Sequence, residues 1–169
     1  MNKYISIISL IMFIGGGRLS AQVISIADFH TGAILADGTV KVWGYNGYGQ
    51  LGQGNTTQIG DGGSEMGDNL SAVALGSGRT ATAIACGDYH TAVILDNGTV
   101  KVWGRNNYGQ LGQGSTTTLG DNSLEMGDNL SIVALGSGRT GDKFCLLYTS
   151  DAADEEDRVE PGGPRTDYY

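Results

Sequence analysis

The 169-residue chain has few of the side chains on which enzymatic chemistry depends. It contains two histidines and two cysteines, and no nucleophile stands beside a base in the spacing of a known catalytic motif. A cysteine and histidine spacing for metal binding is also missing. The glycine-rich GQLGQG of residues 49–54 follows no central parallel strand and opens no helix, so it does not indicate a phosphate site. These absences predict a protein that is not an enzyme and takes no cofactor.

Positive charge is sparse as well. The chain has ten Lys and Arg against eighteen Asp and Glu, a formal net charge of −8. Residues 142–169 hold eight acidic and three basic residues, so −5 of this charge belongs to that tail and −3 to the rest. The basic residues of the two repeats are scattered and form no stripe of the kind that binds nucleic acid: Lys41, Arg79, Lys101, Arg105 and Arg139. The expected partner is therefore a protein rather than a nucleic acid.

Most of the chain is a tandem duplication. Residues 22–81 align with residues 82–141 without a gap, and about 40 of 60 positions are identical. Both copies contain GTVKVWG, YGQLGQG, EMGDNLS and LGSGRT. We interpret the two ranges as two copies of one structural repeat.

Each copy has the period-two pattern of short strands. In the second copy this pattern predicts strands near residues 83–86, 92–95, 100–103 and 132–134. Asp37-Gly38 and Asn97-Gly98 lie between two such runs and supply the positive φ of a hairpin turn. Residues 104–131 have no periodicity and are expected to form a long surface loop, and no helix start precedes an apolar stripe in either copy. Four short antiparallel strands per unit predict an all-β fold of propeller blades.

Residues 28–54 and 88–114 resemble the repeat of the regulator of chromosome condensation family. That pattern runs Gly-x-x-His-Ser/Thr, then Asp/Asn-Gly, then Trp-Gly-x-Asn-x-x-Gly-Gln-Leu-Gly. The second copy carries it at Gly87, His90, Gly98, Trp103, Gly104, Asn106, Gly109, Gln110, Leu111 and Gly112. The first copy carries it at His30, Gly38, Trp43, Gly44, Asn46, Gly49, Gln50, Leu51 and Gly52, with Ala27 in place of the first glycine. The resemblance implies a seven-bladed β-propeller, of which two blades make an incomplete ring.

The histidines and tryptophans of this signature are expected to be structural. His30 and His90 hold the same place in the two copies, so they should lie on different blades and bond to backbone at a strand start. Trp43 and Trp103 are expected to serve blade packing, either buried or partly exposed. Cys86, on a predicted strand, is expected to be buried and unreactive.

Two acidic, glycine-rich loops are candidates for calcium. GDGGSEMGDN and GDNSLEMGDN place three carboxylates each on a loop, at Asp61, Glu65 and Asp68 and at Asp121, Glu125 and Asp128. Their spacing fits no known calcium motif, and Asp and Gly also occur as ordinary turn residues. Both interpretations stay open on the sequence.

The two ends of the chain differ from the repeats. Residues 1–21 have Lys3, an apolar stretch over residues 4–14 and small residues ending at Ala21, which predicts a secretory signal too short to span a bilayer. Alternatively, part of this stretch is a divergent lead-in to the first repeat of an intracellular protein. CLLYTSDAADE at residues 145–155 fits the translation of a sequencing adapter, so residues 142–169 are interpreted as adapter read-through or a disordered acidic tail.

Two function classes follow. The first is a non-catalytic interaction module of a secreted or cell-surface propeller, with partner choice set by loop tips where the copies differ: Gly62, Ser64, Asn122 and Leu124. The second is guanine-nucleotide exchange on a small GTPase, which is what the resemblance to the family's founding member implies.

The resemblance also predicts a hairpin register. Many secreted relatives carry the pattern HTCA…KCWG, whose two cysteine positions are Gly32 and Val42 in one copy here and Ala92 and Val102 in the other. A three-residue loop would place the members of each pair opposite one another, whereas a two-residue loop would oppose Ala92 to Trp103. We expect the first register, in which A92C with V102C forms a disulfide and A92C with W103C does not.

Overall fold

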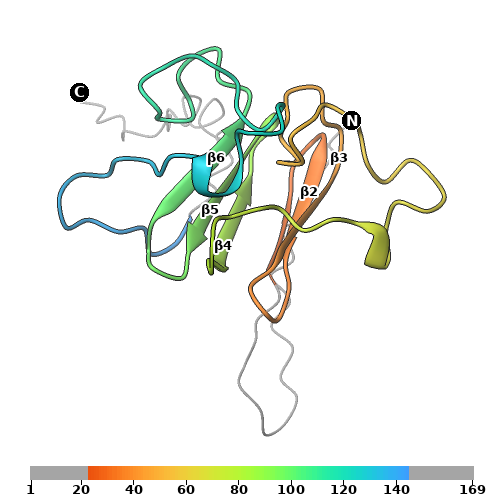
Figure 1. Cartoon of the computed structure of the whole chain (residues 1–169), viewed down its shortest axis with the longest axis horizontal. Coiled ribbons are helices and arrows are strands. Elements are labelled where there is room, and N and C mark those ends of the chain that lie inside the picture. Colours follow the sequence, from red (N-terminus) through yellow and green to blue (C-terminus); the bar gives the residue numbers. More distant parts are fainter. Residues whose placement is uncertain (1–22, 145–169) are drawn as a thin grey trace, which may run out of the picture.

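The computed structural model describes residues 23–144, so the expected signal at residues 1–21 and the adapter-like segment from Cys145 lie outside the described residues (Figure 1). The first repeat contributes β1 (Val23–Ile26), β2 (His30–Ile34) and β3 (Val40–Gly44), followed by a 3-10 turn, η1 (Gly67–Asn69). The second contributes β4 (Ala81–Cys86), β5 (His90–Leu95), β6 (Val100–Gly104) and η2 (Gly127–Asn129). The strands form two antiparallel sheets, in the orders β1-β2-β3 and β4-β5-β6. The predicted all-β fold is confirmed.

The predicted fourth strand is wrong, because each sheet has three strands. Residues 132–134 run beside the outer edge of β6 with one bond, 2.8 Å from Val133 N to Val100 O. The first repeat has the same bond, 2.8 Å from Val73 N to Val40 O, and its next two carbonyls also bond across to the second repeat. Gly127 N donates to Ala74 O at 3.0 Å, and Lys101 Nζ donates to Leu75 O at 2.9 Å. Backbone groups used in this way cannot extend a strand ladder.

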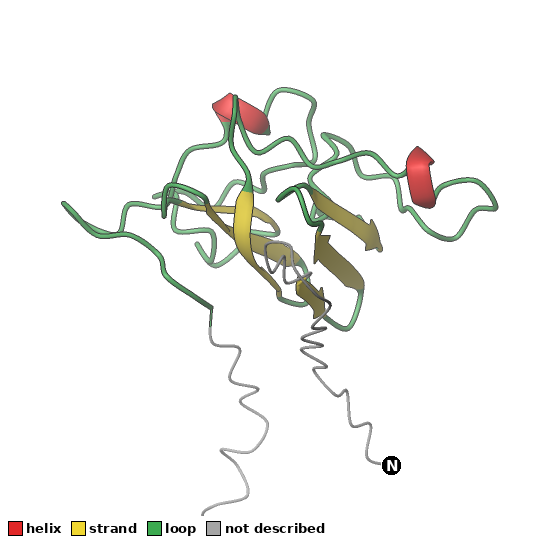
Figure 2. Cartoon of the chain, turned by 90° about the horizontal axis from the view of Figure 1, so that it is seen from below, coloured by secondary structure: helices red, strands yellow, loops and turns green. Residues whose placement is uncertain are grey.

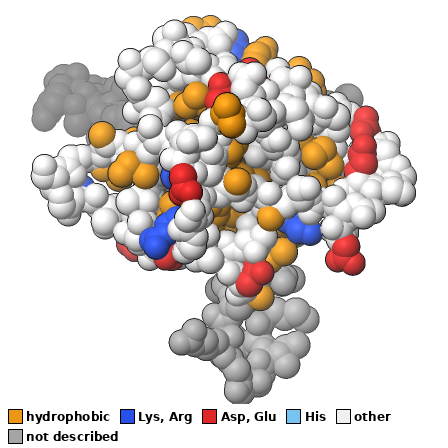
Figure 3. Space-filling model, viewed as in Figure 1, with side chains coloured by type: hydrophobic (Ala, Val, Ile, Leu, Met, Phe, Trp, Pro, Cys, Tyr) orange, Lys and Arg blue, Asp and Glu red, His pale blue; other side chains and the backbone are white. Residues whose placement is uncertain are grey.

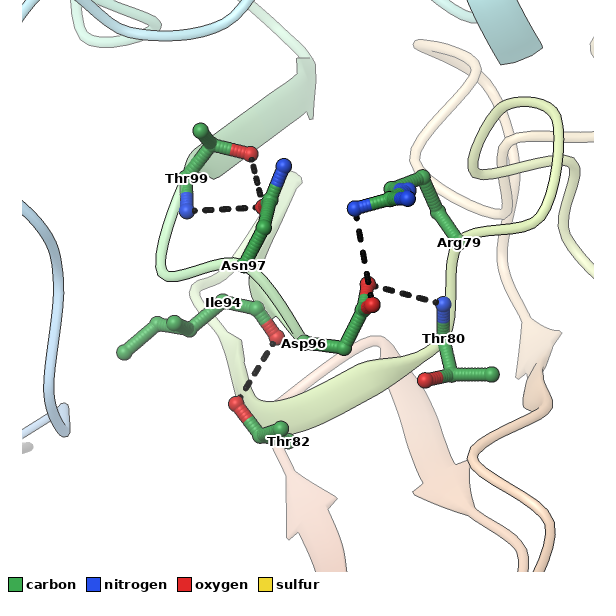
Figure 4. A network of polar contacts seen from close by, with 7 residues as sticks. All are labelled: Arg79, Thr80, Thr82, Ile94, Asp96, Asn97 and Thr99. Carbon is green, nitrogen blue, oxygen red and sulfur yellow. Dashed lines mark hydrogen bonds and ion pairs between the residues drawn. The ribbon is translucent and has the colours of Figure 1, made fainter.

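The β5–β6 hairpin has the three-residue loop that the sequence predicts. Leu95 N donates to Thr99 O at 2.8 Å, and Ala92 lies opposite Val102. Gly98 has a φ of +76° and Asn97 has no positive φ, so the glycine of this pair supplies the predicted positive φ. Asn97 Oδ1 accepts bonds from the Thr99 backbone N at 3.1 Å and its hydroxyl at 2.7 Å (Figure 4). The β2–β3 hairpin repeats this geometry, with Gly32 opposite Val42.

The main hydrophobic core lies between the two sheets, which stand side by side (Figure 2). Strand β4 packs against β1 and β2, and the core draws on side chains from both repeats. Val42 and Leu51 of the first repeat and Val93 and Trp103 of the second have no exposed surface. The two repeats therefore form one packed unit, as expected of units that cannot bury their faces alone.

The long loops after β3 and β6 are held by buried asparagines. Asn46 Nδ2 donates to the carbonyls of Asn55 at 2.8 Å and Thr57 at 3.0 Å. Its Oδ1 accepts a bond from Leu51 N at 2.9 Å. Asn106 makes the same three kinds of bond in the second repeat. In each repeat one Asn side chain thus anchors the first part of the expected surface loop, which explains the Asn of the repeat signature.

Between residues 23 and 144 the chain forms no helix with the length and apolarity that a membrane crossing requires. Figure 3 shows one face of the molecule, on which Lys and Arg side chains lie among acidic ones and form no basic stripe.

Candidate interaction surface

One signature histidine and one signature tryptophan, His30 and Trp103, bond across the seam between the repeats. His30 Nε2 lies 2.8 Å from Thr91 Oγ1, and this hydroxyl donates to Gln50 O at 2.9 Å. Trp103 Nε1 donates to the same carbonyl at 3.0 Å. The expected backbone bond of His30 is therefore replaced by a side-chain partner in the other repeat. His90 stands at the same position of its own sheet, at the start of β5.

Burial makes the two most reactive side chains of this seam inert near neutral pH. Burial, and then the neighbouring His90, lowers the pKa of His30 from 6.5 to about 4. Burial raises the pKa of the Cys86 thiol to about 11, and the side chain is 4% exposed. The neutral imidazole is enclosed by protein and the thiol stays protonated, so neither group is presented to a substrate. The expectation of a buried Cys86 is confirmed.

The acidic loops use their carboxylates as turn anchors. Glu65 Oε2 accepts bonds from the backbone N of Gly60 at 2.7 Å and of Gly62 at 2.9 Å. These bonds hold the pKa of Glu65 below its usual value. Asp61 instead accepts a 2.8 Å bond from Gln58. Across residues 23–144 no three His, Cys, Asp or Glu side chains gather in a way that could hold a metal ion.

In the second acidic loop, too, the carboxylates have separate binding partners. Glu125 Oε2 accepts bonds from Gly120 N at 2.9 Å and Asn122 N at 3.1 Å. Asp128 binds the other repeat, accepting bonds from Ser77 N at 2.8 Å and Ser77 Oγ at 2.6 Å. Asp121 lies beside Glu125, and burial together with that carboxyl raises the pKa of Asp121. The structure therefore does not bring the three carboxylates of either loop together.

An exposed aromatic cluster lies across the repeat boundary, and the sequence reasoning missed it. Phe29 and Tyr89 precede β2 and β5, and Tyr45 and Arg105 follow β3 and β6. The bonds from Tyr45 N to Phe29 O at 2.9 Å and from Arg105 N to Tyr89 O at 2.8 Å fix these four residues at one end of their sheets. The rings of Phe29 and Tyr89 stack with centroids 4.7 Å apart and planes 15° apart. Tyr45 and Tyr48 meet Tyr89 edge-on at 6.3 and 5.2 Å.

Arg105 is held over this cluster by cation–π contacts. Its guanidinium carbon lies 5.1 Å from the ring centroid of Tyr48, 5.5 Å from that of Tyr89 and 5.9 Å from that of Tyr108. The Arg105 Nε is buried and has no hydrogen-bond partner among the described residues. Phe29 is 44% exposed and Tyr108 85%. We call Phe29, Tyr45, Tyr48, Tyr89, Arg105 and Tyr108 the aromatic patch.

The patch has a signal in the sequence. Its six positions are three pairs, each spaced by one repeat length: Phe29 with Tyr89, Tyr45 with Arg105, and Tyr48 with Tyr108. Recurrent exposed aromatics that no core pattern requires are a mark of contact surfaces. The loop-tip residues predicted to choose partners are exposed as well: Gly62, Ser64, Asn122 and Leu124.

Comparison with known proteins places these features in a family. The pattern of the regulator of chromosome condensation (RCC1) repeat matches residues 24–50 and 81–110. The chain is 38% identical over 101 residues to the protein RCC2 homolog of Danio rerio, covering 59% of this chain and 19% of that protein. It is 39% identical over 99 residues to the ultraviolet-B receptor UVR8 of Arabidopsis thaliana, covering 56% and 20%.

A solved structure of yeast RCC1 (Prp20) bound to Kap60 superposes with a TM-score of 0.45 at 18% identity, covering 71% of this chain and 26% of that one. The chain thus spans about a fifth of the length of the two relatives and a quarter of the solved chain. The repeat signature, the two equivalent sheets and the family match agree: the chain is built from two repeats of the RCC1 family.

Proposed function

We propose that this chain is a non-catalytic protein-interaction module whose aromatic patch contacts a protein partner. The observation that carries the proposal is the stack of Phe29 on Tyr89 with Arg105 held over the neighbouring tyrosine rings. Tyr and Arg are the residues that dominate binding energy in protein interfaces. Rings and a guanidinium already held by one another lose little side-chain entropy on binding.

The proposal of binding without turnover is supported by the state of the reactive groups. Burial leaves His30 neutral and Cys86 protonated near pH 7, and both lie inside the repeat seam. The carboxylates Glu65, Glu125 and Asp128 accept bonds from backbone N–H groups. Binding of a protein partner at the surface does not require any of these side chains to react.

We further propose that the chain binds its partner outside the cell, because residues 1–21 have the pattern of a secretory signal. The scattered basic residues of the two repeats, and the net charge of −3 that remains without residues 142–169, support a protein rather than a nucleic-acid partner. A secreted reporter fused behind residues 1–30 tests export, and retention of the fusion in the cell contradicts this part of the proposal.

Quantitative pull-downs with wild type and two patch variants, Y89A and R105A, test the interaction surface. L124A is the matched control, because Leu124 is 77% exposed on a loop tip and is not a residue of the aromatic patch. Loss of a hot-spot residue costs about 2 kcal/mol or more, roughly a 30-fold loss of affinity. We expect the patch variants to lose partners that L124A keeps.

If L124A loses partner binding and both patch variants retain it, the contact lies at the loop tips and not at the aromatic patch. Purified chain that catalyses nucleotide exchange on a small GTPase would overturn the non-catalytic role and support the alternative drawn from the family's founding member.

A further inference from the structure

The dipeptide Asn-Gly occurs twice in the chain, at Asn46-Gly47 and at Asn97-Gly98, in opposite surroundings. An asparagine before glycine is open to attack on its side-chain amide by the next backbone nitrogen, because glycine has no side chain to block the approach. Asn46 is 0% exposed, its Nδ2 donates to two carbonyls, and its Oδ1 accepts a bond from Leu51 N. Asn97 is exposed in the loop between β5 and β6. The same two letters therefore give one fixed and one accessible amide.

The Asn97 amide is held at its oxygen and free at its nitrogen. Its Oδ1 accepts bonds from Thr99 N at 3.1 Å and from Thr99 Oγ1 at 2.7 Å (Figure 4). Its Nδ2 makes no hydrogen bond to any residue between 23 and 144. The two donors point at the oxygen that becomes negative when a nucleophile adds to the amide carbon. The nitrogen that must leave can take a proton from solvent.

The exposure of Asn97 does not come from the end of the chain. Asp37 holds the same position in the first repeat and is also exposed, although the second repeat is packed beside it. Gly38 O accepts a bond from Ala81 N at 2.9 Å, and Gly98 O accepts the matching bond from Gly141 N at 2.8 Å. The following segment thus lies in the same place on both loops and leaves this position open in each.

We propose that Asn97 is a site of spontaneous deamidation and isomerisation, promoted by the two Thr99 donors, whereas Asn46 is protected. Gly98 N gives its proton to hydroxide, releases its 2.9 Å bond to Leu95 O and forms a bond to Asn97 Cγ. The Cγ–Nδ2 bond breaks, and the nitrogen takes up a proton and leaves as ammonia. Water then opens the cyclic imide. Cleavage between Gly98 N and Cγ gives an aspartyl residue, and cleavage at the backbone carbonyl gives an isoaspartyl residue.

The two products differ in how they fit the turn. The first repeat already has an aspartate at this position, where Asp37 Oδ1 accepts a 2.9 Å bond from Thr39 N. This bond holds the pKa of Asp37 below its usual value, so the turn accepts a charged carboxylate. The isoaspartyl product adds a carbon to the main chain of a loop whose ends are joined by a 2.8 Å bond from Leu95 N to Thr99 O. It therefore does not fit this loop.

The loop is also joined to the segment between the two repeats. Asp96 stands next to Asn97, and its carboxylate lies 3.4 Å from Arg79 Nη1. Asp96 N donates to Thr80 O at 2.9 Å, and Thr80 N donates to Asp96 Oδ1 at 3.3 Å (Figure 4). Because β4 begins directly after Thr80, a longer main chain at position 97 should loosen the start of β4.

Peptide mapping by mass spectrometry tests the proposal on the whole chain, incubated for increasing times at mildly alkaline pH. We expect the peptide with Asn97 to gain the mass of deamidation, and to form isoaspartate, at least tenfold faster than the peptide with Asn46. T99V removes the hydroxyl donor and should slow the reaction at least threefold, while T99S should keep the wild-type rate. Looser holding of the side chain alone would speed the reaction in T99V, so an equal or higher rate there would refute the role of Thr99.

D37N is the matched variant, because it creates an Asn-Gly pair in the same turn of the first repeat, beside a repeat that is in place. We expect position 37 of D37N to react within about threefold of Asn97. Position 37 staying intact in D37N, or Asn46 reacting as fast as Asn97, overturns the proposal. Circular dichroism confirms that each variant is folded.

Melting of the separated forms measures the consequence of the reaction. N97D should melt within about a degree or two of wild type, because the first repeat has aspartate in the same turn, and the isoaspartyl form should melt several degrees lower. An isoaspartyl form that melts with wild type would contradict the loosening of β4.

Discussion

His30 should make the stability of this chain depend on pH between about pH 4 and 6.5. Its side chain is 2% exposed, and burial, with His90 as the smaller cause, lowers its pKa from 6.5 to about 4. In that window the unfolded chain binds a proton on His30 that the folded chain does not bind. The free energy of unfolding therefore falls as the pH drops through 6.5, and the contribution of His30 is fully present above it.

The magnitude follows from the two pKa values. A difference of 2.5 pH units between 6.5 and about 4 corresponds to about 3 kcal/mol in total, of which about 2.5 kcal/mol is lost by pH 4.5. A loss of this size is a large part of the roughly 5–15 kcal/mol that stabilises a typical domain.

Urea denaturation of wild type and H30Q at pH 7.5 and pH 4.5 measures the effect. Glutamine can keep a hydrogen bond to the Thr91 hydroxyl but does not titrate, so between the two pH values H30Q should lose about 2 kcal/mol less stability than wild type. Carboxylates with lowered pKa, such as Glu65, titrate equally in both proteins and cancel in the comparison. Equal losses in wild type and H30Q would refute the reasoning.

Three further predictions concern the backbone and the loops. The A92C with V102C variant should oxidise to a disulfide, because the two residues are cross-strand partners about 4.5 to 5.5 Å apart at Cα. Free-thiol titration after oxidation measures the disulfide, and the A92C with W103C variant is the control. G44A should cost about 3 kcal/mol, because Gly44 has a φ of +115° and an added methyl would lie 2.7 Å from Phe29 O. G63A, with open space around it, should melt within a degree or two of wild type. N106A should cost about 2–3 kcal/mol and speed amide exchange in residues 107–118, and protection equal to wild type there would contradict the anchoring role.

Local features of the fold could be predicted from the sequence because they depend on neighbouring residues. The tandem repeat and its strand pattern give β2, β3, β5 and β6 directly. A three-residue loop with glycine in the left-handed conformation fixes which residues face each other, so the pairing of Ala92 with Val102 follows from the loop length alone. Within the Asn97-Gly98 pair, the glycine supplies the positive φ and the Asn97 side chain hydrogen-bonds within the turn.

Only the packing of one repeat on the other decided the remaining features. In the first repeat the carbonyls of Ala74 and Leu75 accept bonds from Gly127 N and Lys101 Nζ of the neighbouring repeat, so these groups do not extend a strand ladder. His30 and Thr91 are 61 residues apart, and no local rule pairs them. The aromatic patch likewise exists because the two sheets stand side by side and bring Phe29 onto Tyr89. The sequence determined the units and their turns through short-range geometry, whereas the tertiary structure decided which polar groups meet across the seam and which rings remain exposed.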